Sequence, residues 1–132
     1  MSRLTTTTAA TLTALALVLG SCGDDGVFRN NRPQLDLTVD EYRIVPQNIT
    51  TRPGRLKFVV RNTGRLTHNL VIEVPPAKPE DNPRIVNRTA TMQPGQTAEP
   101  IKVTLKPGVY RLVCTIANHD DLGQFGKLTV TP

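Results

Sequence analysis

Short stretches in which apolar and polar residues alternate run along most of this chain, and they predict β-strands. The clearest stretch covers residues 35–39, where Leu, Leu and Val are separated by Asp and Thr. Pro-Gly pairs that begin at positions 53, 94 and 107 predict turns between such stretches. Strands are predicted over residues 35–39, 42–45, 56–60, 68–74, 101–105, 109–115 and 125–131, and residues 84–93 receive no assignment. About seven to eight short strands indicate an all-β Greek-key sandwich or barrel.

Composition agrees with one small β domain. The chain has 132 residues, the size of a single domain, and its eleven Pro and nine Gly disfavour long helices. The formal net charge is +5, but the basic residues are scattered and aromatic residues are not interleaved with them. A nucleic-acid surface has the opposite character, so no nucleic-acid partner is expected.

The first residues have the layout of a secretory signal peptide. Arg3 gives a positive start, residues 9–19 are mostly apolar, and two small residues follow. The apolar stretch is too short for a comfortable membrane-spanning helix, which needs about 20 apolar residues. Residues 19–22 resemble a bacterial lipobox, which implies cleavage before Cys22 and lipid attachment to Cys22. The alternative is an ordinary signal peptide with a coincidental cysteine.

The chain is therefore expected to have three parts. Residues 1–21 are a lipoprotein signal peptide, residues 22–34 are the lipidated Cys22 and a flexible polar tether, and residues 35–132 are the folded domain. The protein is expected on the extracytoplasmic side of a membrane, periplasmic or at the cell surface, held there by its lipid anchor. Lipidation of Cys22 leaves Cys114 as the only cysteine of the folded domain.

Cys114 belongs to a set of three residues with metal-binding chemistry. It lies near the end of a predicted strand, His119 follows in a loop, and His68 opens a different predicted strand. In a sandwich these strand ends can lie side by side and bring one thiolate and two imidazoles together. This is the trigonal donor set of blue-copper electron-transfer sites, which carry a weak axial Met or Gln. Because imidazole suits both Cu(I) and Cu(II), little rearrangement is expected when an electron moves.

The same residues resemble cupredoxins of the plastocyanin and azurin type. The resemblance covers residues 35–131, and its most specific parts are the Cys-x₄-His-x₃-Gly-x-x-Gly pattern from Cys114, the THNLVI strand, and the PGQTA and LKPGVYRLVC stretches. The resemblance implies a copper-binding Greek-key β-sandwich. It also implies that His68, Cys114 and His119 hold one type 1 copper ion.

Two further residues are interpreted through this resemblance. Relatives usually have Met directly after the first glycine of the pattern, but this chain has Gln124. We predict that the amide oxygen of Gln124 is the axial ligand and lowers the reduction potential, the alternative being that Gln124 only caps the loop. Asn69, next to His68, is expected to tie the two ligand loops together by hydrogen bonds.

Other metal sites fit the sequence less well. A dinuclear copper centre needs a second loop cysteine, and a structural zinc site needs a second Cys or a third His. Met92 is the only Met of the folded domain and lies in an unrelated segment, so a core or surface position is expected for it rather than axial ligation.

The predicted function is electron transfer by copper that cycles between Cu(I) and Cu(II). Neither a substrate-activating site nor a catalytic triad is seen, so the protein is not expected to be an enzyme or to have a small-molecule substrate. A monomer with redox-protein partners is expected, and Asp120 and Asp121 beside His119 are either a partner surface or a solvated turn. The alternatives are a carrier that delivers copper to an extracytoplasmic cuproenzyme and a metal-free cupredoxin-like interaction domain.

Overall fold

The computed structural model describes residues 26–132 of the chain. The predicted signal peptide, Cys22 and the beginning of the predicted tether lie outside the described residues. Within residues 26–132, no helix is long and apolar enough to cross a membrane.

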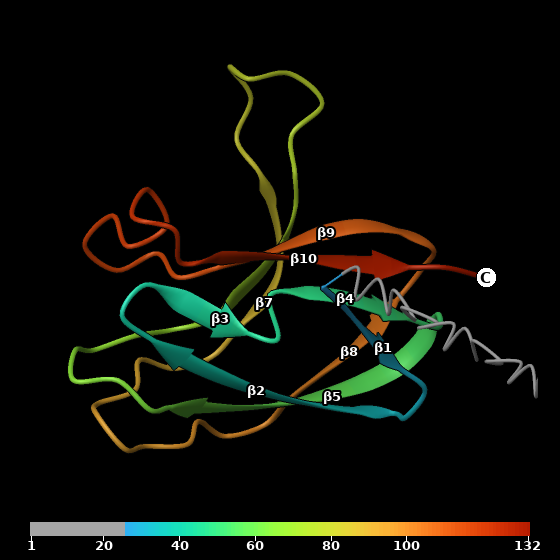
Figure 1. The fold of residues 1–132 in the computed structure, drawn as a ribbon. Coiled ribbons are helices and arrows are strands. Elements are labelled where there is room, and N and C mark those ends of the chain that lie inside the picture. The colour runs from blue at the N-terminus through green and yellow to red at the C-terminus, as the bar shows by residue number, and fades with distance from the viewer. Residues whose placement is uncertain (1–25) are drawn as a thin grey trace, which may run out of the picture.

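Two β-sheets make up the described part of the chain (Figure 1). One sheet has six strands in the order β1-β4-β10-β9-β6-β7, and the other has four in the order β3-β2-β5-β8. The strands are β1 Val27–Asn30, β2 Gln34–Asp40, β3 Arg43–Val45, β4 Asn48–Thr51, β5 Gly54–Asn62, β6 Val71–Val74, β7 Arg84–Arg88, β8 Ile101–Leu105, β9 Gly108–Val113 and β10 Phe125–Val130. The predicted all-β fold is confirmed.

The core follows directly from the alternation in the sequence. Every second residue of β2 and β5 is buried, and these two strands pair in parallel with Leu35 opposite Phe58. The six-stranded sheet contributes its own inward-facing residues to the same cluster. Fully buried aliphatic and aromatic side chains thus fill the space between the sheets: Leu35, Ile44, Ile49, Phe58, Leu70, Ile72, Leu105, Leu112 and Leu128.

The strand register brings the candidate ligands to one end of the sandwich. β6 and β9 pair antiparallel with Val71 opposite Val113, so the chain entering β6 meets the chain leaving β9. Cys114 directly follows β9, and His68 lies just before β6. β10 begins at Phe125, which pairs with Val113, so the connection between β9 and β10 lies at the same end.

Several predicted boundaries were wrong. The sequence places residues 27–30 in the tether, but Val27–Asn30 forms β1, which pairs in parallel with β4. The side chain of Asn30 is buried and donates a hydrogen bond to Thr51 Oγ1, so local polarity did not prevent pairing. The strand predicted over residues 68–74 begins only at Val71, and His68 forms an isolated bridge with Met92. Neither β4 nor β7 was predicted.

Replacement of Phe58 by Ala should destabilise the fold strongly. The Phe58 side chain has no solvent exposure, and Phe→Ala changes in cores typically cost about 3–5 kcal/mol. Urea unfolding of a soluble protein of residues 24–132 measures this free energy. Phe28→Ala is the control because Phe28 is 48% exposed and should cost far less. Equal losses in the two variants would contradict the assigned core.

Candidate metal centre

Three donor atoms form a buried triangle at the end of the sandwich. The Nδ1 atoms of His68 and His119 lie 3.2 Å apart, and they lie 3.9 and 3.7 Å, respectively, from Cys114 Sγ. His68 and Cys114 have no solvent exposure, and His119 is 5% exposed. The structure therefore brings together the three residues that the sequence placed in one set.

The triangle has the size that a metal ion requires. A trigonal ion with zinc-like bonds, about 2.0 Å to nitrogen and 2.3 Å to sulfur, needs about 3.5 Å between the nitrogens and about 3.7 Å from each nitrogen to sulfur. The three observed separations lie within a few tenths of an ångström of these values. A buried thiol and two buried imidazoles gain little from this convergence unless an ion binds between them. The donor set and its spacing thus fit a mononuclear metal.

Backbone hydrogen bonds hold each of the three residues in place. His68 and Met92 exchange both backbone hydrogen bonds, at 3.1 and 2.8 Å. Cys114 N donates to Gln124 O, so the two ends of the ligand loop are closed on each other. Within the loop, Ala117 and Asn118 have φ values of 49° and 55°. Two consecutive left-handed residues turn the chain sharply and aim His119 back toward Cys114.

Asn69 connects the segment of His68 with the segment of Cys114. Its Nδ2 donates to Thr115 Oγ1 at 3.0 Å, and its Oδ1 accepts from Thr115 N at 2.9 Å. Thr115, in the segment of Cys114, thus bonds to both the donor and the acceptor of the Asn69 amide. This reciprocal pair fixes the distance between the residue after His68 and the residue after Cys114.

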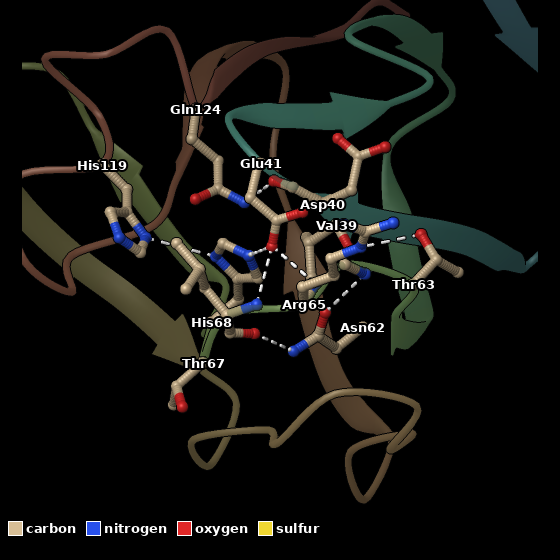
Figure 2. Close-up of polar contacts among 12 residues, drawn as sticks. Val39, Asp40, Glu41, Asn62, Thr63, Arg65, Thr67, His68, His119 and Gln124 are labelled. Carbon is tan, nitrogen blue, oxygen red and sulfur yellow. Dashed lines mark hydrogen bonds and ion pairs between the residues drawn. The ribbon is translucent and has the colours of Figure 1, made fainter.

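Gln124 lies beside the triangle and is fully buried. Its Nε2 donates to the carbonyl oxygen of Asp40 at 2.7 Å and to that of Arg43 at 3.5 Å. The amide cannot be turned the other way, because its oxygen would then face two carbonyl oxygens. Gln124 Oε1 consequently points to the side of His119 and His68 (Figure 2), where it has no hydrogen-bond partner among residues 26–132.

Glu41, in the turn between β2 and β3, contacts His68 from outside the triangle. Its Oε1 lies 3.3 Å from His68 Nε2 and accepts hydrogen bonds from the backbone N–H groups of Leu66 and Arg65. The Leu66 N–H is the main reason that the pKa of Glu41 falls to about 2; partial burial opposes the fall, and Arg65 and His68 add to it. Glu41 is not predicted from the sequence, because an acidic residue in a turn resembles a solvated side chain.

Asp120 and Asp121, the two acidic residues beside His119, differ in their contacts. Asp120 forms an ion pair with Arg111 at 3.5 Å, and Arg111 also contacts Glu73 at 3.3 Å. Asp121 is exposed and lies in the same turn.

Met92 is 1% exposed and packs in the hydrophobic core.

Comparison with known proteins identifies the fold. No protein-family model matches the sequence, and no curated protein matches it. Dithionite-reduced auracyanin from Roseiflexus castenholzii is 25% identical and superposes with a TM-score of 0.66, covering 78% of this chain and 100% of auracyanin. Auracyanin A from Chloroflexus aurantiacus, described as a "blue" copper protein, is 17% identical, covers 77% and 100%, and has a TM-score of 0.64. Rusticyanin from Thiobacillus ferrooxidans is 20% identical, covers 80% and 82%, and has a TM-score of 0.60. The two-sheet fold expected from the resemblance to cupredoxins is confirmed.

Loss of the Asn69–Thr115 pair should open the site. In Asn69→Ala both hydrogen bonds to Thr115 are lost, at a cost of about 1–3 kcal/mol for the two together, so we expect Cys114 in the metal-free protein to react with a thiol reagent about tenfold faster. Residues 24–132 contain Cys114 as their single cysteine, so the labelling rate reports this position. Asn87→Ala is the control, because Asn87 Oδ1 accepts from the N–H of its neighbour Arg88 and does not connect two segments. Equal rates in both variants would contradict the role of the pair.

Proposed function

We propose that the protein is an extracytoplasmic electron carrier with one type 1 copper ion held by His68, Cys114 and His119. The observation that carries this proposal is the buried triangle of one sulfur and two Nδ1 atoms. The donor types are those of blue-copper sites, and softer or harder metals favour other sets. The fold shared with auracyanin A, a "blue" copper protein, supports the same metal.

The bound ion would supply a one-electron couple, Cu(II)/Cu(I), and the protein contributes a fixed donor set. His68 is hydrogen-bonded to Met92 and Cys114 to Gln124 through the backbone, and Asn69 sets the distance between the segments of His68 and Cys114. Because the donors are already converged in a buried pocket, they move little when the charge at the site changes. Small rearrangement is what makes an electron-transfer site fast.

His119 provides the shortest exit for the electron. It is the member of the triangle with solvent exposure, at 5%, whereas His68 and Cys114 have none. Its ring also packs edge-on against Tyr42 at a centroid distance of 5.3 Å. We infer that a redox-protein partner, donor or acceptor, docks over His119. Asp121 belongs to this surface, while the charge of Asp120 is partly neutralised by Arg111.

Gln124 Oε1 is proposed as the axial ligand. A buried amide oxygen without a hydrogen-bond partner is costly unless another group satisfies it, and a metal ion in the triangle is such a group. The amide nitrogen is anchored to Asp40 O, so the oxygen is already oriented. An oxygen donor favours Cu(II) over Cu(I) more than a thioether does.

Electron transfer fits the described site better than copper delivery or a metal-free interaction domain. A delivery protein must hand its metal over, and a triangle with exposures of 0–5% is poorly suited to exchange. An interaction domain has no need for three converging donors. Cys22 lies outside the described residues, so its lipid anchor and the location that the anchor implies remain predictions. The monomeric state is also a prediction.

Addition of one equivalent of Cu(II) to residues 24–132 should produce an intense visible thiolate-to-copper band. Ascorbate should bleach the band, and Cys114→Ser should abolish it, because the band requires the sulfur donor. A colourless protein that keeps its copper would favour delivery over electron transfer. A protein that binds no copper would favour the interaction domain.

Gln124→Met should raise the reduction potential. The substitution exchanges an oxygen for a thioether next to the triangle, which removes a preference for Cu(II). Protein-film voltammetry measures the change, and Gln34→Met is the control because Gln34 lies in β2 and bonds to Asp36. An unchanged or lowered potential in Gln124→Met would overturn axial ligation by Gln124.

A further inference from the structure

One carboxylate oxygen connects the β2–β3 turn to His68 and to the loop before it. Glu41 Oε1 accepts from Arg65 N and Leu66 N, each at 2.7 Å, and lies 3.3 Å from His68 Nε2 (Figure 2). We propose that Glu41 is a positioning residue that fixes the tautomer of His68 and strengthens the preference of the site for Cu(II). The copper part of this inference rests on the proposed function.

The contacts of Glu41 decide which nitrogen of His68 carries the proton. A carboxylate oxygen can only accept hydrogen bonds, and here two backbone donors already aim at it. His68 Nε2 must therefore be the N–H donor in this contact. A neutral imidazole with the proton on Nε2 has its lone pair on Nδ1. That atom lies 3.2 Å from His119 Nδ1, inside the donor triangle.

The negative charge of Glu41 acts on the metal through His68. A carboxylate that accepts from the outer N–H of a metal-binding His makes the ring a more basic ligand. The side chain of Glu41 is 30% exposed while that of His68 has no exposure, so the contact lies at the wall of the pocket. A more basic imidazole stabilises the more positively charged oxidation state, Cu(II). The expected result is a lower reduction potential than His68 alone would give.

Gly64 creates the space that the carboxylate occupies. A Cβ atom at this position would lie 2.5 Å from Glu41 Oε1 and 3.0 Å from Asp40 Cα. Gly64 cannot easily withdraw, because its N–H donates to Asn62 Oδ1 at 2.9 Å. Asn62 is fully buried and donates from Nδ2 to Leu66 O and Met92 O. The loop before His68 is thus built around the Glu41 carboxylate, and any side chain at position 64 must displace it.

Two substitutions separate the charge of Glu41 from its position. Glu41→Gln keeps an oxygen that can accept from Arg65, Leu66 and His68 but removes the charge. Gly64→Ala keeps the charge but pushes the carboxylate away from His68. Asp36→Asn is the matched control, because it removes a charge of the same strand, β2, whose side chain accepts from Gln34 instead.

In the purified protein, Glu41→Gln should weaken Cu(II) binding about tenfold relative to Cu(I), within the range found for outer-sphere changes. For a one-electron couple, that ratio corresponds to a rise in potential of about 59 mV. Gly64→Ala should raise the potential as well, and Asp36→Asn should leave it unchanged. Chelator competition and voltammetry measure these quantities, and thermal unfolding verifies that each variant is folded.

Ring ¹⁵N chemical shifts of His68 in the metal-free protein test the tautomer without copper. The wild type and Glu41→Gln should show the proton on Nε2, and Gly64→Ala should show a mixture. A wild-type proton on Nδ1, or equal potentials in the wild type, Glu41→Gln and Gly64→Ala, would overturn the role of Glu41. A wild type that binds no copper would instead refute the proposed function and the effect on potential, while the shifts still decide the tautomer.

Discussion

The reciprocal hydrogen bonds between Asn69 and Thr115 are the constraint on which the candidate metal centre depends. The two sheets bring the segments of His68 and Cys114 to one end of the sandwich, but β6 begins three residues after His68. Strand pairing therefore does not by itself determine where the imidazole lies. The amide of Asn69 positions this segment, because its donor and its acceptor both bond to Thr115. The Met92 bridge then fixes the backbone of His68 from the other side.

Two side-chain oxygen atoms near the donor triangle differ in charge and in the way they contact the site. Within the described part of the chain, Gln124 Oε1 is neutral and has no hydrogen-bond partner, whereas Glu41 Oε1 is anionic and contacts the site through His68. In the proposed function both oxygens favour Cu(II), so their effects on the potential have the same sign. Both also depend on the turn after β2, because Gln124 is anchored to Asp40 O and Glu41 is the next residue. This turn therefore connects Gln124, the proposed axial ligand, with His68.

Local sequence patterns predict most strands of both sheets but not three short strands of the six-stranded sheet. β2, β5 and β8 to β10 carry clear alternation or follow Pro-Gly turns, and their positions agree with the prediction within a few residues. β1, β4 and β7 were missed, because short strands with polar residues such as Asn30 and Asn48 form through pairing with distant partners. The same limit applies to the site. The donor types and spacing single out His68, Cys114 and His119, whereas the contact between Glu41 and His68 requires the parallel pairing of β2 with β5.

X-ray absorption at the copper edge, recorded on the oxidised and the reduced protein, tests the central claim most directly. The claim is that a preformed, buried His₂Cys triangle holds copper with little rearrangement in both oxidation states. We expect one sulfur and two imidazole nitrogens around copper in both spectra, with nearly unchanged distances. The absence of sulfur, or a change in the number of these ligands on reduction, would contradict the account.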